Sequence, residues 1–136
     1  MLVTYEIFRF LAKEIFFKLP KNKQYAGIVC PLYGGFYLGD YLRRKFNIPF
    51  YTLRLQSYEN NKQKSILVHT IPFLPHGNYL LVDDIYDTGN TMKWIEDNYP
   101  ACTFTQVTLI TKKKKDNLIY GEYVENNIWV DFWWEF

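Results

Sequence analysis

The sequence of 136 residues contains little cysteine, little net charge and no long apolar run. Its two cysteines, Cys30 and Cys102, cannot build a disulfide-rich secreted scaffold, so we expect reduced thiols and a cytoplasmic protein. The formal net charge of +2 is too small to favour nucleic acid or an anionic membrane as a partner. Hydrophobic residues, by contrast, make up 49% of the chain and aromatic residues 20%, which excludes a disordered protein.

The N-terminal stretch predicts a helix that packs on the domain, and not a membrane-spanning segment. Charged side chains, among them Glu6, Arg9 and Lys13, interrupt its apolar residues, so neither a signal peptide nor a membrane span fits. The apolar side chains instead recur at helical spacing, and Thr4 is a candidate N-cap. We therefore expect an amphipathic helix over residues 4–18.

Strands and helices are expected to alternate along the rest of the chain. The apolar patterns predict strands at residues 26–30, 48–55, 65–72, 79–84 and 103–111, and helices at 35–47 and 88–99. The polar segment 56–64 is expected to be a loop, and the aromatic segment 119–136 a β-rich appendage beside the sheet. This alternation predicts an α/β fold with a central, mostly parallel twisted sheet flanked by helices.

The stretch YLLVDDIYDTGNTM, residues 79–92, follows a buried strand with three carboxylates, Asp83, Asp84 and Asp87. In an open parallel sheet, ligands bind beyond the carboxyl ends of the strands. Residues 88–91 lie where the chain enters the next helix, and there the free backbone N–H groups and the helix dipole favour a phosphate. Carboxylates instead suit sugar hydroxyls or a divalent cation. A ribose that carries a 5-phosphate matches both halves of the stretch.

The same stretch closely resembles the phosphoribosyl-pyrophosphate motif of type I phosphoribosyltransferases, a hydrophobic strand with two acidic residues followed by Asp-Thr-Gly-x-Thr. Other segments resemble the 6-oxopurine branch, which includes xanthine-guanine and hypoxanthine phosphoribosyltransferases. The resemblance implies a type I phosphoribosyltransferase fold in one domain, 1–136, with a core at about 20–112 and a small hood at about 116–136. It also implies purine salvage, in which 5-phosphoribose passes from phosphoribosyl pyrophosphate to guanine, xanthine or hypoxanthine, giving the nucleoside monophosphate and pyrophosphate.

The motif implies roles for the residues after the buried strand. Asp83 and Asp84 would hold the ribose hydroxyls, and Asp84 would also help to seat Mg²⁺, the implied cofactor. Asp87 would accept the proton of the purine as general base. The 5-phosphate would be wrapped by the residues from Asp87 onwards, namely Thr88, Gly89, Asn90 and Thr91.

Two further segments resemble the parts of the family that bind pyrophosphate and close the site. The turn after the first strand resembles the pyrophosphate loop and contains Tyr33, Gly34 and Gly35. The family usually has Arg before the two glycines, whereas Tyr33 can donate a hydrogen bond to pyrophosphate but cannot neutralise it. The segment SYENNKQK resembles the mobile catalytic loop, with Lys64 where related enzymes often have Arg. This loop contributes three candidate residues, Ser57, Tyr58 and Lys64.

The C-terminal third resembles the part of the family that recognises the purine. In TLITK, Lys112 would donate to the purine 6-oxygen, and in WVDFWWEF, Trp129 would stack on the base. The backbone carbonyl of Val130 would read the other purine edge. From the residues alone, a solvated lysine run over 112–115 stays open as the less favoured alternative for Lys112, and an ordinary core aromatic as the less favoured alternative for Trp129.

Two other functions stay open. A regulatory protein that binds phosphoribosyl pyrophosphate or a nucleotide without efficient turnover is favoured by the absence of the usual Arg, whereas Asp87, Lys112 and Trp129 favour an enzyme. An RNA-binding protein that uses residues 112–115 would need a wider basic surface. The expected partners are phosphoribosyl pyrophosphate and a purine base. Because the family commonly forms dimers or tetramers, we also expect a homodimer or homotetramer. The aromatic residues expected at the surface are Phe16, Phe17 and Trp134.

Overall fold

The computed structural model describes residues 1–60 and 63–135, and for residues 57–60, 63–65 and 67 it gives the backbone alone. The strands are β1 (Leu2–Val3), β2 (Gly27–Leu32), β3 (Phe50–Asn60), β4 (Gln63–Thr70), β5 (Asn78–Tyr86), β6 (Thr103–Thr111), β7 (Ile119–Tyr123) and β8 (Asp131–Phe132). The helices are α1 (Tyr5–Lys18), α2 (Phe36–Phe46) and α3 (Asn90–Asn98), with a 3-10 helix η1 at Trp133–Glu135. Within the described ranges, no helix has the length and apolar character needed to cross a membrane.

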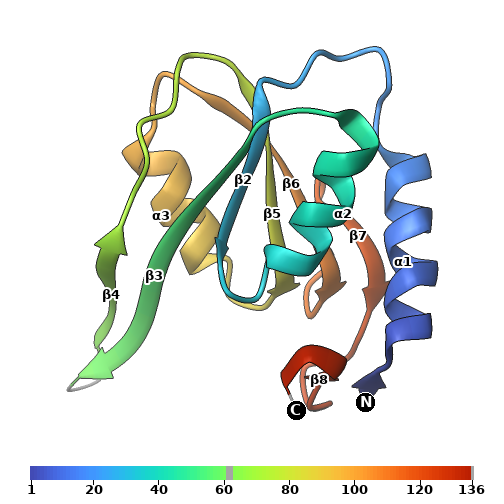
Figure 1. The fold of residues 1–136 in the computed structure, drawn as a ribbon. Helices are drawn as coiled ribbons and strands as arrows, with labels where there is room; N and C mark the ends of the chain where they lie inside the picture. Colours follow the sequence, from blue (N-terminus) through green and yellow to red (C-terminus); the bar gives the residue numbers. More distant parts are fainter. Residues whose placement is uncertain (61–62, 136) are drawn as a thin grey trace.

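Six strands form the central sheet, in the order β4-β3-β2-β5-β6-β7. Every neighbouring pair is parallel except β3 and β4, which are antiparallel. The carboxyl ends of the parallel strands meet at the lower edge of the sheet in Figure 1, and the N-terminus and the C-terminal segment lie beside the same edge. The expected α/β fold with a mostly parallel sheet is confirmed, and this edge is the one at which such sheets bind ligands.

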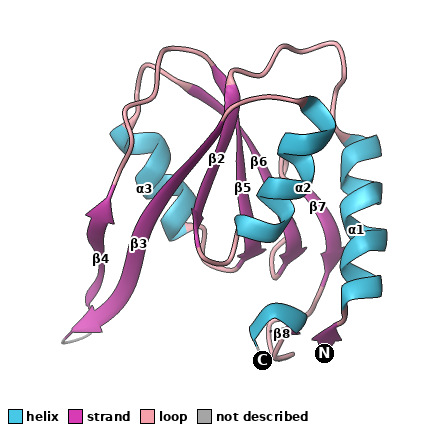
Figure 2. Ribbon diagram, in the orientation of Figure 1, coloured by secondary structure: helices cyan, strands magenta, loops and turns pink. Residues whose placement is uncertain are grey.

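The two faces of the sheet carry separate apolar cores. Because successive strand residues point to opposite faces, Ile28 and Leu80 pack on the side of α1 and α2, whereas Val29 and Leu81 pack on the side of α3. The strands in the middle of the sheet are therefore apolar on both faces, as expected for parallel strands covered by helices. Figure 2 shows α1 and α2 on one side of the sheet and α3 on the other.

Helix α1 begins where its capping residue predicts. The Thr4 hydroxyl accepts a hydrogen bond from the N–H of Ile7 at 3.2 Å, which satisfies one of the donors left free at a helix start. The apolar positions of the helix, Phe8, Leu11, Ala12 and Ile15, are buried against the sheet. Burying such a stripe stabilises the fold by about 2 kcal/mol for each large side chain. The expected amphipathic helix over residues 4–18 is thus confirmed.

The segment 56–64 was expected to be a loop, and this expectation was wrong. β3 continues to Asn60 and pairs with β4 from Gln63, so both arms of the segment are strand. The resulting hairpin extends from the sheet edge in Figure 1. An antiparallel pair is joined by backbone hydrogen bonds, which do not depend on an apolar pattern, so its polar sequence gave no strand signal.

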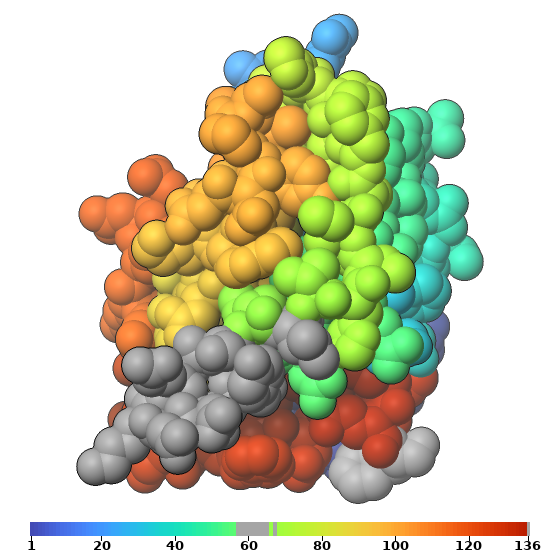
Figure 3. Space-filling model, turned by 90° about the vertical axis from the view of Figure 1, so that its left-hand side faces the viewer, coloured from blue at the N-terminus to red at the C-terminus, as the bar shows by residue number. Residues whose placement is uncertain are grey.

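The chain after β4 packs over α3 on the far face. Figure 3 shows the chain around residues 68–77, coloured lime, beside α3 and the turn that follows it, coloured orange. The Tyr99 hydroxyl at the end of α3 donates to the carbonyl of Pro72 at 2.6 Å, and this hydrogen bond joins the two segments. The residues after β4 therefore lie against the end of α3.

The C-terminal segment divides between the central sheet and a small hood. β7 pairs in parallel with β6, so residues 119–123 belong to the sheet, in contrast to the expected appendage. Gly121 gives the reason, because a Cβ at this position would lie 2.7 Å from the Leu109 carbonyl oxygen and 3.1 Å from the Cβ of Leu11. The missing side chain lets α1 cross β7 closely. Beyond β7, β8 pairs in parallel with β1 and forms the hood together with η1.

Aromatic stacking attaches the hood to the domain. Trp134 stacks on Phe132 with a centroid distance of 4.6 Å and on Tyr37 of α2 at 4.8 Å. Phe16 likewise packs edge-to-face on Phe46 at 5.4 Å. Of the three aromatic residues expected at the surface, only Phe17 is exposed, with 66% of its area accessible. The other two stabilise the fold.

Candidate active site

Most of the residues expected at the site lie around the carboxyl ends of β2, β5 and β6. The end of β5 provides Asp83 and Asp84, and the chain that follows lines a cavity of about 200 Å³. This cavity is bounded by residues 83–92, so the acidic strand end and the start of α3 share one concave surface. The stretch singled out in the sequence is therefore a single site in three dimensions.

The two adjacent carboxyls of β5 are desolvated and close to each other. Burial, followed by the neighbouring charge of Asp84, raises the pKa of Asp83 well above its usual range. Burial also raises the pKa of Asp84. The N–H of Asp84 donates to Oδ1 of Asp83 at 2.8 Å, and the N–H of Ile85 donates to Oδ1 of Asp84 at 2.7 Å. A pair held in this way favours a ligand that brings hydroxyl donors or positive charge.

The loop after β2 lies directly against Asp84. A Cβ on Gly34 would be 2.5 Å from Oδ2 of Asp84, and a Cβ on Gly35 would overlap the Val82 carbonyl oxygen. Both positions therefore require glycine for the loop to approach β5 this closely. The N–H of Gly35 donates to the carbonyl of Pro31 at 3.2 Å, which closes the turn, while Tyr33 is 64% exposed. The expected pyrophosphate loop and the acidic pair are thus in contact.

The turn into α3 has the geometry of an anion site. Gly89 adopts the left-handed conformation, with φ of 82°, and the N–H of Asn90 donates to the Thr88 hydroxyl at 3.3 Å. A Cβ on Gly89 would overlap the Tyr86 hydroxyl, so the backbone passes close to that ring. α3 begins at Asn90 with its first N–H groups directed at the turn. Asp87, at the rim of the same cavity, is exposed.

Lys112 reaches from the end of β6 to the hood. Its Nζ donates to the carbonyl of Glu125 at 3.1 Å and also to the carbonyl of Ile128. Ile128 precedes Trp129, which is 76% exposed and donates from Nε1 to Oδ1 of Asp131 at 2.9 Å. Lys112 is therefore not a freely solvated lysine, and Trp129 is not a core aromatic. The two expected base-binding residues are therefore joined through Ile128, whose carbonyl accepts a hydrogen bond from Lys112 and which directly precedes Trp129.

The hood loop is fixed on both sides of Trp129. The N-terminal amino group of Met1 donates to the Trp129 carbonyl at 2.7 Å, and the N–H of Asp131 donates to the Met1 carbonyl at 2.8 Å. The side chain of Val130 is buried, with 8% of its area exposed. The exposed indole of Trp129 is thus carried by a backbone that is tied to β1.

Three expected residues fall outside the described side chains. Ser57 and Tyr58 lie on β3 and Lys64 on β4, and the structure gives their backbone alone. Their implied roles in closing the site stay predictions. Among the described side chains, no group of three or more His, Cys, Asp and Glu residues could enclose a metal ion.

Sequence reasoning did not single out Arg54, which lies beside the loop after β2. The register of β2 and β3 pairs Leu32 with Arg54, and the Arg54 guanidinium carbon lies 5.5 Å from the centroid of the Tyr33 ring. Arg54 alternates with the buried Leu53, so it faces away from the α3 side of the sheet. The alternation along the strand was the only sequence signal that Arg54 faces away from Leu53. Its position beside Tyr33 depends on the strand register, which the sequence does not display.

Comparison with known proteins assigns the chain to a family. A family model for the phosphoribosyl transferase domain matches residues 4–136. The chain belongs to the phosphoribosyltransferase family. As a phosphoribosyltransferase it is an enzyme that transfers glycosyl groups, and the expected type I phosphoribosyltransferase fold is confirmed.

Solved structures of other phosphoribosyltransferases share this fold. The chain is similar to a xanthine-guanine-hypoxanthine phosphoribosyltransferase from Helicobacter pylori, with 24% identity, a TM-score of 0.76 and coverage of 98% of this chain and 92% of that chain. A purine phosphoribosyltransferase from Pyrococcus horikoshii matches with 21% identity, a TM-score of 0.77 and the same coverage of both chains. A Neisseria gonorrhoeae protein with bound ppGpp matches with 21% identity, a TM-score of 0.76 and coverage of 98% and 87%.

Proposed function

We propose that this phosphoribosyltransferase acts in purine salvage and transfers 5-phosphoribose from phosphoribosyl pyrophosphate to a 6-oxopurine, namely guanine, xanthine or hypoxanthine. One observation carries the proposal. The acidic pair and the anion loop after β5 share a cavity, while Lys112 of the neighbouring strand β6 contacts the hood segment that bears the exposed Trp129. A sugar phosphate and a flat base with an acceptor oxygen are the ligand halves that such groups recognise.

The residues after β5 would bind the ribose 5-phosphate. The backbone of residues 88–91 and the start of α3 would bind the phosphate, because the first N–H groups of a helix have no partner within the helix. Asp83 and Asp84 would accept hydrogen bonds from the ribose hydroxyls. Their negative charge would also stabilise the positive charge that develops on the ribose as the bond to pyrophosphate breaks.

The purine would bind between Trp129 and Lys112. The indole offers an exposed face for stacking, and the Lys112 ammonium would exchange its backbone carbonyl partners for the 6-oxygen. The Val130 carbonyl would read the opposite purine edge. Asp87 at the cavity rim would accept the purine proton while a purine nitrogen forms its bond to the ribose carbon that pyrophosphate leaves.

Mg²⁺ fits the donor set of this site. Few carboxylates converge among the described residues, and Mg²⁺ commonly takes one or two carboxylates together with waters and substrate phosphates. Asp84 would help to hold it, since a dication offsets the cost of ionising two desolvated neighbouring carboxyls. When bound, the metal would neutralise pyrophosphate as it leaves.

A second candidate function is a regulatory protein that binds phosphoribosyl pyrophosphate or a nucleotide without efficient turnover. Tyr33 supports it, because this residue leaves the pyrophosphate loop without a cation of its own. The likeness to the Neisseria gonorrhoeae protein with bound ppGpp is in keeping with it. Both functions use the same sugar-phosphate pocket and differ only in turnover.

Incubation with phosphoribosyl pyrophosphate, Mg²⁺ and each of guanine, xanthine, hypoxanthine and adenine separates these functions. We expect nucleoside monophosphate with at least one 6-oxopurine, detected by chromatography. Product with adenine alone would refute the 6-oxopurine assignment. Binding of phosphoribosyl pyrophosphate without product from any base would establish the regulatory function instead. Light scattering on the same preparation tests the expected homodimer or homotetramer, and fractionation of cells tests the expected cytoplasmic location.

A further inference from the structure

The proposed pyrophosphate loop has an electrostatic deficit. Pyrophosphate carries several negative charges, and the loop that would bind it lies against the Asp84 carboxylate, near Gly34. Tyr33 offers a hydroxyl and no charge. Apart from Mg²⁺, and unless a cation from another element reaches the loop, only backbone dipoles of the protein would oppose the repulsion between the leaving group and the acidic pair.

Arg54 is placed to supply that cation. β3 and β5 flank β2 on opposite sides, so the loop after β2 lies between Arg54 and Asp84. The guanidinium carbon of Arg54 lies 5.5 Å from the centroid of the Tyr33 ring, within the range of a cation–π contact. A guanidinium that stacks on a ring keeps its N–H edge free for the two parallel hydrogen bonds that phosphate oxygens accept.

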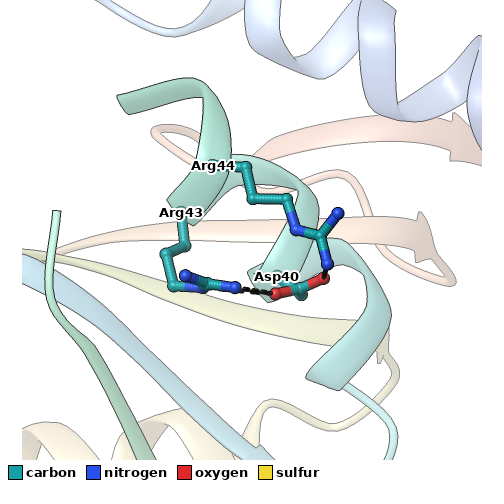
Figure 4. Close-up of polar contacts among 3 residues, drawn as sticks. All are labelled: Asp40, Arg43 and Arg44. Atoms are coloured by element: carbon teal, nitrogen blue, oxygen red, sulfur yellow. Dashed lines mark hydrogen bonds and ion pairs between the residues drawn. The ribbon is translucent and has the colours of Figure 1, made fainter. Parts of the chain in front are cut away.

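Arg54 differs from the other arginines near this face in its partners. Among the described side chains, no carboxylate lies within ion-pair distance of Arg54. Arg43 and Arg44 of α2, in contrast, both pair with Asp40, at 2.5 and 3.2 Å (Figure 4). Arg43 also lies over an aromatic ring, that of Phe50, so it provides a matched arginine whose charge is already compensated.

We propose that Arg54 is a pyrophosphate-binding residue and that Tyr33 and Arg54 together replace the arginine expected before Gly34. Tyr33 orients the guanidinium by stacking, and Arg54 provides the charge and the paired donors. The inference rests on the proposed function, because it assigns the counter-charge for the leaving group of that reaction.

Calorimetric titration with inorganic pyrophosphate in the presence of Mg²⁺ tests the assignment. Arg54→Ala should weaken pyrophosphate binding by about 10- to 100-fold, the usual effect of losing charge-assisted hydrogen bonds. Arg54→Lys should have a pyrophosphate affinity between those of the unaltered protein and Arg54→Ala, since lysine keeps the charge but cannot donate two parallel hydrogen bonds. Arg43→Ala is the matched control and should change the affinity by less than about twofold, and ribose 5-phosphate should bind equally to all four proteins.

A rescue variant separates a binding role from a structural one. Tyr33→Arg in the Arg54→Ala background should recover most of the lost affinity, because the new guanidinium emerges from the same loop. Unchanged pyrophosphate binding in Arg54→Ala, or an equal loss for ribose 5-phosphate, would overturn the assignment. If the unaltered chain binds ribose 5-phosphate but not pyrophosphate, the proposed reaction is refuted. If it binds both ligands, and the Arg54 variants bind pyrophosphate as tightly as it does, this inference alone is refuted.

Discussion

Replacing Gly34 with alanine tests whether the contact between the loop after β2 and Asp84 matters for function. The new Cβ would lie 2.5, 2.6 and 2.7 Å from Oδ2, Cγ and Oδ1 of Asp84, about 1 Å inside ordinary carbon contact distances. The carboxylate is the free end of a short side chain and can rotate away, at the expense of the 2.7 Å hydrogen bond from the N–H of Ile85. Losing that bond costs about 1 kcal/mol, and in a domain of this size the Tm falls by about 4 °C.

The same rotation should cost far more in turnover than in stability. A displacement of about 1 Å in a group that positions the substrate can reduce the rate about 100-fold. Gly35→Ala provides the contrast, because its Cβ would overlap the backbone carbonyl of Val82 and lie 3.0 Å from Sγ of Cys30. The Val82 carbonyl is backbone and cannot rotate away, so we expect a loss of about 3 kcal/mol from overpacking.

Thermal unfolding and steady-state nucleotide formation on the two variants measure these effects separately. The reasoning predicts that Gly34→Ala stays folded with a large loss of kcat/KM, while Gly35→Ala unfolds at a much lower temperature. If Gly34→Ala keeps full activity, then the Asp84 carboxylate does not hold the substrate from the position described. If both variants unfold alike, the loop contacts backbone at both glycines.

The remaining predictions concern the acids and the lysine of the site. Asp87→Asn should lower kcat about 100-fold, a typical general-base contribution, while calorimetric binding of ribose 5-phosphate is unchanged; unaltered turnover would remove this residue from the mechanism. Lys112→Ala should raise the KM for a 6-oxopurine about 10- to 100-fold and leave that for phosphoribosyl pyrophosphate alone, with Lys113→Ala as the silent control; equal losses for both substrates would refute the assignment. Because burial raises the folded-state pKa of Asp83, stability should fall as the pH rises above the unfolded value near 3.9. Asp83→Asn should therefore stabilise the fold by about 1 kcal/mol at pH 7 in urea titrations. Its free energy of unfolding should decline less between pH 4 and 7 than that of the unaltered protein, and its activity should be abolished. The same pH dependence in both proteins would show that this carboxyl is not desolvated.

Local signals were enough to predict much of the fold. Thr4 accepts the hydrogen bond expected of an N-cap, and the strand expected at residues 103–111 coincides with β6. The helix expected at 35–47 includes all of α2, whose C-cap Asn47 adopts the left-handed conformation. These elements are determined by residues close together in the sequence, namely capping groups and apolar runs, and a single sequence displays both kinds of signal.

Long-range pairing could not be predicted in the same way. The strand arms of the 56–64 segment are polar, and their pairing is a backbone property that composition does not display. β7 joins the sheet because Gly121 admits α1, a fact that depends on the three-dimensional path of a helix about 100 residues earlier. Strand pairing of this kind depends on which distant segments of backbone come together in the folded chain.

The residues of the candidate site also fall into two groups, those that are contiguous in the sequence and those that only the fold brings together. The acidic pair and the turn into α3 are contiguous in sequence, so their common cavity could be predicted. The Nζ of Lys112 meets the Ile128 carbonyl only through the fold of the hood, and Arg54 meets Tyr33 only through the register of β2 and β3. The contacts that depend on long-range folding are therefore the ones that the sequence pattern left unseen.

A crystal structure of the protein with guanosine monophosphate tests the central claim most directly. The account predicts the 5-phosphate on the backbone N–H groups of residues 88–91, the ribose hydroxyls at Asp83 and Asp84, and the purine against Trp129. A nucleotide bound elsewhere, with the cavity after β5 free of its phosphate, would contradict the account.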